Sequence, residues 1–409
     1  TMVVPVVSVP RADISLRRDV ILLLDLAGVD VDDLLYLDDD IVTRHLLPPP
    51  AAVASSKTPP VTLTLVDHNR IRSSLSHLSS SVTYILDHHE DEGDHNIRAT
   101  ADSGTRTIAF EDGRATVAST CTLVAERMFR RKQDDSVPAK DDQSTNTISI
   151  DGSLGLMLLG VILLDSVNML PAAGKGMARD EEAMRSLMER TDWVSASDDC
   201  GRGSQRSRLV DAAALDKIFP DDGNGKPDRT ALFEALSGAK NDPRFWLGLS
   251  TTDRLRIDYK RFSVPTIQGR PASLSSPARI TSIGLSSVLV DADTLLSREG
   301  FRDDLAEFVK SSDVGLFGIL AVTFGEGGGP RREMLLTGPD PGIVDSFATF
   351  LLEHPDAAFL EIAEREAGDD NGANDDDARS VVRVFRQGNG KGSRKQVAPI
   401  LLGHAAGMN

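Results

Sequence analysis

The sequence has little of several features that would assign a protein to a class at once. Its 409 residues include 2 cysteines, Cys121 and Cys200, so no disulfide framework is expected and a reducing compartment is favoured. No apolar run reaches the roughly 18 residues that a membrane span needs, and the most apolar stretch, residues 155–164, is far shorter. Residues 1–10 lack the basic-then-apolar pattern of a signal peptide. These absences predict a soluble, cytoplasmic protein that does not bind membranes.

Basic residues are also scarce relative to acidic ones. The chain has 45 Lys and Arg against 62 Asp and Glu, which gives a formal net charge of −17. A surface that coats a nucleic-acid duplex needs the opposite sign, so we expect no duplex partner and a local group of residues for any anionic ligand. The hydrophobic fraction of 40% is enough to build cores. The sequence therefore predicts a folded chain, and we expect a monomer or weak oligomer.

The N-terminal half alternates apolar extended stretches with amphipathic ones, which is typical of an α/β domain around a parallel sheet. The predicted strands are residues 3–9, 34–37, 61–66 and 82–86. The predicted helices are residues 16–26, 70–78 and 154–164, and the last is nearly all apolar, as in a helix buried on several sides.

The C-terminal half is richer in predicted strands. These are residues 255–264, 280–285, 316–323 and 380–385, with an amphipathic helix at 301–309, a glycine-rich hairpin tip at 325–329 and a solvated acidic loop at 366–379. We therefore predict an α/β fold of two lobes. The N-terminal parallel-sheet domain covers residues 1–195, a helical connection 196–249 and the mixed-sheet domain 250–409, with the active site in the cleft between lobes.

Acidic and histidine side chains follow two neighbouring predicted strands. Asp67, His68 and Asn69 come directly after one strand, and Asp87, His88 and His89 end the next. The carboxyl edge of an open parallel sheet is where such sheets bind ligands. Imidazole with carboxylate suits Mn²⁺, Mg²⁺ or Co²⁺. Neither cluster contains a cysteine, which argues against structural zinc. A lone histidine after a strand is usually no ligand, but two clusters at consecutive strand ends favour a metal site.

A further carboxylate, Asp165, follows the apolar stretch 154–164. One interpretation is an ordinary aspartate at a helix C-terminus, although its charge there opposes the helix dipole. The other is a metal ligand, which explains why a charge is tolerated beside an apolar helix.

Five segments of the chain resemble a known family. Val66-Asp67-His68-Asn69 and Asp87-His88-His89 resemble the second and third motifs of the DHH phosphoesterase superfamily, and residues 156–165 followed by Ser166 resemble the fourth. Two C-terminal segments resemble the DHHA2 domain: Leu255-x-x-Asp258-x-Lys260-x-Phe262 and Gly392-Ser393-Arg394-Lys395-Gln396-Val397-x-Pro399. The DHHA2 branch holds family II inorganic pyrophosphatases, cytosolic exopolyphosphatases and prune-like proteins. The acidic tail Glu90-Asp91-Glu92-Gly93 makes the chain most similar to a eukaryotic cytosolic exopolyphosphatase.

The resemblance implies a metal site with two divalent cations, Mn²⁺ or Mg²⁺, with Co²⁺ also suitable. Asp67 would bridge the cations, and His88 and Asp165 would complete one of them. His89 would face the substrate phosphate. Asn69 and Asp87 would support these ligands by hydrogen bonds, and His68 would either join the metal ligands or support them in the same way.

Three basic residues, Lys260, Arg394 and Lys395, would bind phosphates from the other lobe according to the same resemblance. Arginine can grip phosphate oxygens with two donors, while lysine acts as a point charge. Taken alone, without the resemblance, Arg394 and Lys395 are better explained as a solvated basic loop. The nearby residues Arg383, Arg386 and Lys391 are expected to extend a positive path for a long polyanion.

The function implied is metal-dependent exopolyphosphatase activity, which hydrolyses terminal phosphoanhydride bonds of inorganic polyphosphate and releases orthophosphate. The family's first motif, a His or Asn followed by Asp-x-Asp on the first strand, is not found in the sequence. The alternatives are therefore an inorganic pyrophosphatase, a prune-like nucleotide phosphodiesterase, or a catalytically silent prune-like interaction protein. Cys121 is expected to be a small buried residue rather than a nucleophile.

Overall fold

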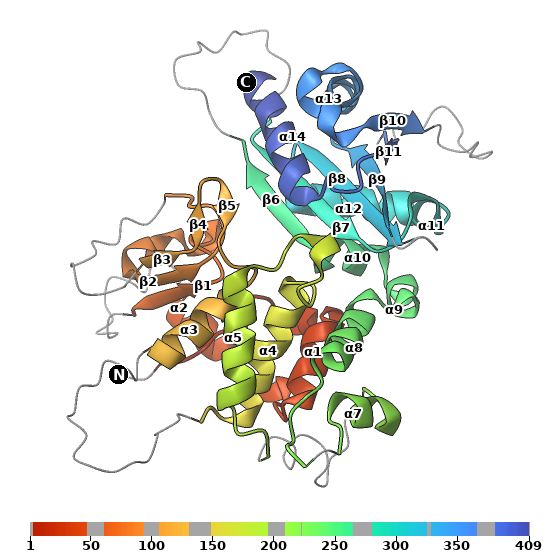
Figure 1. Cartoon of the computed structure of the whole chain (residues 1–409). Helices are drawn as coiled ribbons and strands as arrows, with labels where there is room; N and C mark the ends of the chain where they lie inside the picture. The colour runs from red at the N-terminus through yellow and green to blue at the C-terminus, as the bar shows by residue number, and fades with distance from the viewer. Residues whose placement is uncertain are drawn as a thin grey trace. The chain divides into compact units, whose positions relative to one another are not determined.

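Figure 1 shows the computed structural model of the chain. The structure describes residues 3–46, 61–93, 106–130, 149–194, 209–221, 223–264, 280–324, 329–365 and 381–408. The chain divides into two compact units, Thr1–Lys240 and Asn241–Asn409, and each is described by itself. The domain boundaries expected near residues 195 and 250 stay predictions.

The first unit contains a parallel sheet of three strands. These strands are β1 (Leu63–Val66), β2 (Val82–Asp87) and β3 (Arg106–Ile108), and they lie in that order with both pairs parallel. Strand β2 lies in the middle and buries Ile85 and Leu86, as a strand covered on both faces should. The predicted parallel sheet is confirmed, and the strands expected at 61–66 and 82–86 are β1 and β2. Because parallel strands run the same way, the residues after β1 and β2 lie at one edge.

The core of the first unit is built around helix α4 (Gly152–Asp165), which confirms the helix predicted at 154–164. The side chain of Asp151 caps it by accepting a hydrogen bond from the Leu154 N–H at 3.1 Å. The helix is apolar on all sides, and its buried side chains include Leu156, Leu159, Ile162 and Leu163. It packs against α1 (Arg18–Leu26), α3 (Thr120–Arg130) and α5 (Ala178–Arg190), as Figure 1 shows.

Short elements complete the first unit. They are the helices α2 (Asp40–Leu46), α7 (Ala212–Ile218) and α8 (Arg229–Asn241), the small strands β4 (Phe110–Glu111) and β5 (Arg114–Ala115), and 3₁₀ segments at Arg11–Leu16, Val31–Asp33, Ser73–Ser81 and Pro171–Ala173.

Two predicted strands near the N-terminus are wrong. Of residues 3–9 and 34–37, only Val7 and Tyr36 pair, in an isolated parallel bridge. The Val3 side chain is 88% exposed, so valine-rich sequence there has nothing to pack on and β propensity alone does not make a strand. The helix predicted at 70–78 is a 3₁₀ segment instead, because its run of serines competes for backbone hydrogen bonds.

The second unit contains a mixed sheet of six strands, which confirms the predicted mixed sheet. The strand order is β10 (Ile362–Arg365), β11 (Arg383–Gln387), β9 (Pro330–Thr337), β8 (Leu316–Phe324), β7 (Ser282–Val288) and β6 (Tyr259–Ser263). Strands β7 and β8 are parallel, and the other neighbouring pairs are antiparallel.

Helices cover both faces of this sheet, because successive side chains of a strand point to opposite faces. Leu316 and Leu320 of β8 pack in one cluster with residues of α13 (Pro341–Glu353) and α14 (Arg394–Met408). Phe317, between them, contacts Phe308 of α12 (Phe301–Ser312) with ring centroids 5.4 Å apart. The remaining elements are α9 (Pro243–Gly248), α10 (Thr251–Ile257), α11 (Ala292–Leu296) and a 3₁₀ segment at Pro355–Leu360.

The strand predicted at 255–264 is wrong in its first part, which is the end of α10. Ser250 caps this helix, since its Oγ accepts a hydrogen bond from the Asp253 N–H at 3.1 Å. Serine followed three residues later by an acidic residue is a signature of a helix start. Strand β6 then begins at Tyr259.

Several expected features lie outside the described residues, among them His95, Cys200, residues 325–328 and the acidic loop 366–379. Strands β8 and β9 nevertheless pair on either side of the glycine-rich segment, with Phe324 opposite Pro330, as the predicted hairpin requires.

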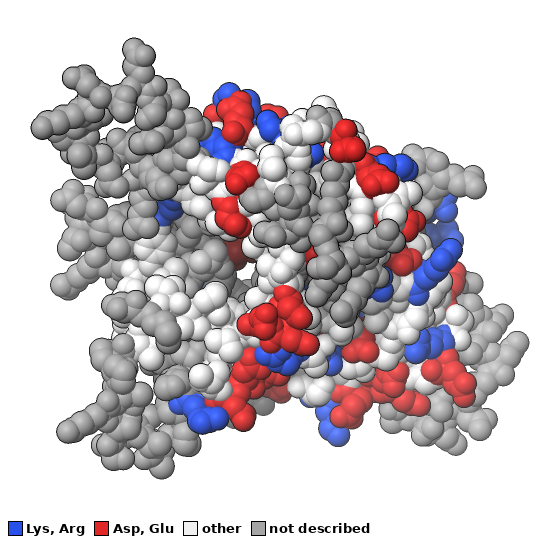
Figure 2. Space-filling view, turned by 90° about the horizontal axis from the view of Figure 1, so that it is seen from below, with Lys and Arg blue, Asp and Glu red and all other residues white. Residues whose placement is uncertain are grey.

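Charged side chains are mixed on the surface. Figure 2 shows acidic side chains in several clusters with basic side chains beside them on one face. This arrangement agrees with the net charge of −17. In the described part of the chain, no helix combines the length and the apolar character needed to cross a membrane.

Candidate metal centre

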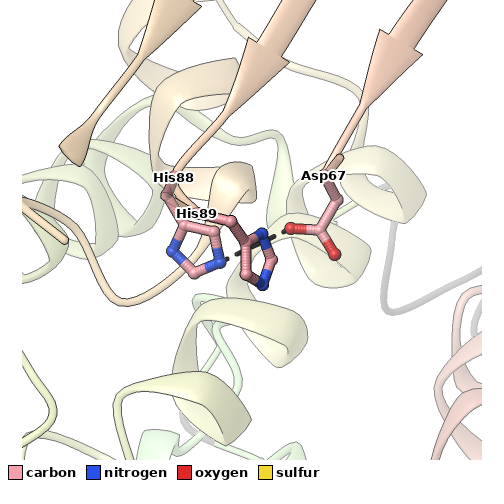
Figure 3. A group of neighbouring side chains, drawn as sticks. All are labelled: Asp67, His88 and His89. Carbon is pink, nitrogen blue, oxygen red and sulfur yellow. Dashed lines mark ion pairs between the residues drawn. The ribbon is translucent and has the colours of Figure 1, made fainter. Parts of the chain in front are cut away.

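Three side chains converge where strands β1 and β2 end (Figure 3). Asp67 follows β1, and His88 and His89 follow β2, so the predicted placement at the carboxyl ends of neighbouring strands is confirmed. One ligand atom from each of the three residues lies within 4.8 Å of the other two. The His88 Nε2 atom is 3.5 Å from the Asp67 Oδ1 atom. Among the described residues, this is the one group of three or more His, Cys, Asp or Glu at such spacing.

The backbone at Asp67 turns sharply as soon as β1 ends. Its φ angle is +65°, in the left-handed region that aspartate tolerates better than most residues. The Asp67 N–H still donates to the Leu86 carbonyl of β2 at 2.9 Å, so this hydrogen bond fixes the Asp67 backbone beside β2. The Thr120 hydroxyl donates to Asp67 Oδ1 at 2.8 Å and so orients the carboxylate. The side chain is 62% exposed, which leaves it accessible to a ligand.

His88 is buried, and its protonation pattern is fixed by its surroundings. Its Nδ1 atom lies 3.1 Å from the Val117 carbonyl oxygen. Because a carbonyl can only accept, Nδ1 carries the proton and donates. In the neutral imidazole, Nε2 then keeps its lone pair, and this is the atom that faces Asp67. A backbone carbonyl that holds the second ring nitrogen is a typical support for a metal-binding histidine.

His89 is held in a similar way by Asp87. Its Nδ1 atom lies 2.8 Å from Asp87 Oδ1, and Asp87 is fully buried. Burial acts to raise the pKa of Asp87, but hydrogen bonds and charge from His89, with further donors from Asn69 and the His88 backbone, lower the pKa to about 2. Asp87 is therefore ionised near neutral pH and accepts the Nδ1 proton of His89, whose Nε2 atom is left for a ligand.

Asn69 joins the segments that follow the two strands. Its Nδ2 atom donates to Asp87 Oδ2 at 2.7 Å and to the Glu90 carbonyl at 2.9 Å, and its Oδ1 atom accepts from the Glu92 N–H at 2.9 Å. The Asn69 side chain is buried. His68, by contrast, donates from Nδ1 to the carbonyl of Val66 at 2.9 Å and lies outside the group around His88.

Asp165 is the last residue of α4 and lies near this group without joining it. The pKa of its carboxyl is raised, chiefly because surrounding protein displaces water; a hydrogen bond from Ser119 opposes this, and the negative charge of Asp67 adds to it. The negative charge of Asp67 therefore acts on the carboxyl group of Asp165. Its role as a ligand stays a prediction.

Together, these side chains fit a divalent cation. His88 presents an unprotonated Nε2 in the neutral state and Asp67 an exposed carboxylate oxygen, and one ring nitrogen of His89 lies within the 4.8 Å spacing of the group. Mixed imidazole and carboxylate ligands suit Mn²⁺ and similar ions. The nearby Cys121 is not a nucleophile at neutral pH, because burial and then the charges of Asp165 and Asp67 raise the pKa of its thiol to about 12.

The basic residues expected to bind phosphate lie in the second unit. Lys260 is an exposed residue of β6, and Arg394 and Lys395 begin α14. Arg394 is largely buried, with its side chain 17% exposed, and its Nη2 atom lies 2.9 Å from Asp258 Oδ1. It also donates to the Asp258 backbone carbonyl. The guanidinium is thus held in one orientation by a residue of the Asp258-x-Lys260 motif.

One basic residue of the expected polyanion path pairs with acidic side chains. Arg383 forms ion pairs with Glu364 at 2.6 Å and with Asp345 at 2.7 Å. Its charge is therefore partly compensated by two carboxylates, and the positive path through Arg383, Arg386 and Lys391 stays a prediction.

Comparison with known proteins places the second unit in a family. Residues 234–403 match the model of the DHHA2 domain. This part of the chain is therefore a DHHA2 domain. The DHHA2 domain contains both segments from which the resemblance was drawn, and with them Lys260, Arg394 and Lys395.

Similarity to full-length relatives extends beyond the DHHA2 domain. The chain is 23% identical over 399 residues to exopolyphosphatase PRUNE1 of Rattus norvegicus, covering 97% of this chain and 67% of the relative. It is 26% identical over 412 residues to a protein of Schizosaccharomyces pombe provisionally named exopolyphosphatase, covering 98% and 82%. A solved structure from Methanococcus jannaschii, provisionally assigned as a family II inorganic pyrophosphatase, matches with a TM-score of 0.48 at 18% identity over 96% of this chain and 88% of that one.

Three residues at the centre were missed by sequence reasoning. The Val117 carbonyl accepts a hydrogen bond from His88, the Thr120 hydroxyl donates one to Asp67, and Ser119 acts to lower the pKa of Asp165. Ser119 and Thr120 belong to a polar run at a helix start, which resembles any ordinary helix cap in sequence. A backbone carbonyl leaves no sequence signal at all.

Proposed function

We propose that this DHHA2 protein is a divalent-metal-dependent hydrolase that releases orthophosphate from the ends of inorganic polyphosphate. The observation that carries the proposal is the group of Asp67, His88 and His89, in which one ring nitrogen of each histidine and a carboxylate oxygen converge within 4.8 Å at the ends of two parallel strands. The names of the relatives, exopolyphosphatases, support the choice of substrate.

The proposed roles follow from how each side chain is held. Asp67 and His88 hold the cation, Mn²⁺ or Mg²⁺, and Asp165 supplies a further carboxylate. When bound, a divalent cation neutralises phosphate charge and makes a bound water more acidic. Hydrogen bonds with Thr120 and Val117 orient Asp67 and His88 before a cation binds. These two side chains therefore need to move little when it does.

His89 is proposed to bind the substrate phosphate. Its side chain is 37% exposed, whereas its partner Asp87 is fully buried. The Asp87 carboxylate fixes the ring and favours a proton on Nδ1, so that Nε2 can donate to a phosphate oxygen when the ring is protonated. In the reaction, the oxygen of a water molecule bonds to the terminal phosphorus, the P–O bond to the chain breaks, and the shortened polyphosphate leaves as the anion. The protons of the water remain on the released orthophosphate or pass to the solvent.

Lys260, Arg394 and Lys395 are proposed to bind further phosphate oxygens. A polyphosphate carries a charge on every unit, and catalysis of phosphoryl transfer depends mainly on positioning and charge neutralisation. Asp258 supports this role for Arg394, because the 2.9 Å ion pair and the bond to its backbone carbonyl fix the guanidinium plane.

The test is phosphate release with Mn²⁺ or Mg²⁺ from long-chain polyphosphate and from pyrophosphate, together with hydrolysis of a cyclic nucleotide. We expect orthophosphate from long-chain polyphosphate, which shortens one unit at a time. His88→Gln should abolish the release, and the matched control His77→Gln, at an exposed histidine of the same unit, should not.

Other outcomes identify the alternatives. Release from pyrophosphate alone would make the chain a pyrophosphatase, and hydrolysis of the cyclic nucleotide alone a phosphodiesterase. Tight Mn²⁺ binding with no hydrolysis of any of the three substrates would favour a silent interaction protein and contradict the proposal.

A further inference from the structure

A second buried aspartate, Asp180, lies behind the candidate metal centre. It belongs to the first turn of α5 and is fully buried. It accepts hydrogen bonds from the Ala118 N–H at 3.0 and 2.9 Å, from the Thr122 hydroxyl at 2.6 Å and from the Met177 N–H at 2.8 Å. A buried carboxylate is costly unless such donors satisfy it. Its position in the molecule therefore depends on these three partners.

Most of these bonds leave the helix to which Asp180 belongs. An aspartate at a helix start ordinarily accepts from its own first turn, as Asp180 does from Met177. Ala118 and Thr122, however, are 62 and 58 residues away in the chain. The Asp180 carboxylate thus accepts hydrogen bonds from both ends of segment 118–122. Capping of α5 alone does not explain that arrangement.

The segment held in this way is the one that orients the candidate metal ligands. The carbonyl of Val117, directly before it, accepts a hydrogen bond from Nδ1 of His88. The Thr120 hydroxyl donates a hydrogen bond to Asp67 at 2.8 Å. The side chain of Ser119, between them, acts to lower the pKa of Asp165. Both hydrogen bonds come from one short stretch of the chain, so a shift of that stretch would move His88 and Asp67 together.

The neighbouring residue Arg179 strengthens the same junction. Its guanidinium pairs with Glu126 of α3 at 2.7 Å and donates to the Thr116 hydroxyl at 3.0 Å. Two consecutive residues of α5 therefore hold the chain on either side of the segment. Arg179 binds outside it, at Thr116 and Glu126, whereas Asp180 binds within it.

We propose that Asp180 is a positioning residue for the metal centre: it fixes segment 118–122 so that Val117 and Thr120 hold His88 and Asp67 in their metal-binding geometry. The role in metal binding rests on the function proposed above. The effect on the His88 ring does not, because the hydrogen bond from Nδ1 to Val117 exists without a metal.

The first variant is Asp180→Asn, which keeps the size but places an amide N–H₂ against backbone donors. Loss of a supporting partner typically weakens metal binding about 10- to 100-fold, and we expect a fall of that size in Mn²⁺ affinity measured by calorimetry. The matched control is Asp211→Asn. Asp211 caps α7 in the same unit by accepting from the Ala214 N–H at 2.8 Å, and this variant should bind Mn²⁺ like the unaltered chain.

A second readout uses the metal-free chain. The ¹⁵N chemical shifts of the His88 ring, recorded near pH 9 where imidazoles are neutral, should show Nδ1 protonated in the unaltered chain and a mixture of tautomers in Asp180→Asn. This measurement decides the positioning role even if the unaltered chain fails to bind Mn²⁺, an outcome that would contradict the proposed function instead.

Thr122 supplies a milder pair of variants in case Asp180→Asn does not fold. Thr122→Val removes the 2.6 Å bond to Asp180, while Thr122→Ser retains a hydroxyl. We expect Thr122→Val to shift the His88 tautomers and weaken Mn²⁺ binding in the same direction, and Thr122→Ser to restore both. An unchanged His88 tautomer and Mn²⁺ affinity in folded Asp180→Asn, or in Thr122→Val, would overturn the proposal.

Discussion

The two units of the chain hold the charged groups beside their proposed binding residues in different ways. In the first unit, the buried carboxylates Asp87 and Asp180 accept from backbone, hydroxyl, amide and imidazole donors. In the second, the partly exposed Arg394 pairs with the carboxylate of Asp258. The first pattern fixes the orientation of cation ligands, and the second fixes a guanidinium group. Metal binding and phosphate binding should therefore respond to different mutations.

The largest effect is expected for Asp67→Asn. The substitution removes the carboxylate charge from a group whose ligand atoms lie within 4.8 Å of one another, so both Mn²⁺ affinity and phosphate release should be lost. The loss should exceed the roughly 10- to 100-fold typical of a supporting partner. Calorimetry with Mn²⁺ and a phosphate-release assay measure the two quantities. Asp216→Asn, at an exposed residue of the same unit, is the control, and equal activity in the two variants would contradict the role of Asp67.

Asp87→Asn should have the next largest effect. An amide cannot accept all the donors that converge on Asp87, so the His88 backbone, which carries a proposed metal ligand, and the His89 ring lose their fixed positions. We expect roughly 10- to 100-fold weaker Mn²⁺ binding and a loss of about 1–3 kcal/mol in the free energy of unfolding. Denaturant unfolding without metal separates the two effects. Asp228→Asn, which removes a cap of α8, should lower stability alone; unchanged metal affinity in folded Asp87→Asn would argue against its supporting role.

A smaller and different effect is expected for Arg394→Ala in the second unit. A hydrogen bond to a charged group contributes about 1.5–3 kcal/mol, so kcat/KM for polyphosphate should fall about 10- to 100-fold. Mn²⁺ affinity should stay within about two-fold, since the proposed metal ligands all belong to the first unit. Steady-state kinetics and calorimetry provide the two readouts. The control is Arg244→Ala, at an exposed arginine. A loss of Mn²⁺ affinity in Arg394→Ala would contradict the claim that metal binding depends on the first unit alone.

The smallest expected effect concerns His404, which stacks on Phe350 with ring centroids 4.0 Å apart. Burial, and then the charge of His354, lower the pKa of His404 below its ordinary value near 6.5. The unfolded chain therefore binds this proton more tightly. The stabilisation is complete above that ordinary value and is lost as pH falls below it, towards the lowered value in the folded chain.

Unfolding midpoints at pH 7.5 and 5.5, measured with a chelator present, test this dependence. His404→Gln should reduce the difference between the two midpoints, whereas His77→Gln should leave it unchanged. Identical pH dependence in His404→Gln and the unaltered chain would rule out the assignment to His404.

The strand ends of the candidate site were predictable, and the reason is local. Apolar strands followed directly by Asp67 and by Asp87-His88-His89 carry their own signal, since parallel strands must end at one edge. The valine-rich residues 3–9 also have high strand propensity, but they have no neighbouring strand to pack on, and the strand predicted there is wrong. Strand propensity is thus informative only where tertiary packing agrees with it.

The supports of the site were not predictable from sequence. Asp180 lies at a polar helix start, where aspartate is common for reasons of capping alone. Its contacts with Ala118 and Thr122 cross about sixty residues of chain, and nothing in the local pattern distinguishes it from a surface aspartate. The helix start at Ser250 was different, because Ser-x-x-Asp carries a readable signature that outweighs the apolar run after it.

The central claim is that Asp67 and His88 bind a divalent cation beside His89, and Mn²⁺ binding followed by pulsed electron paramagnetic resonance tests it most directly. The account predicts bound Mn²⁺ with nitrogen coupling from imidazole, and a coupling that is lost or strongly reduced in His88→Gln but kept in His77→Gln. Absence of Mn²⁺ binding, or a nitrogen coupling that is unchanged in His88→Gln, would contradict it.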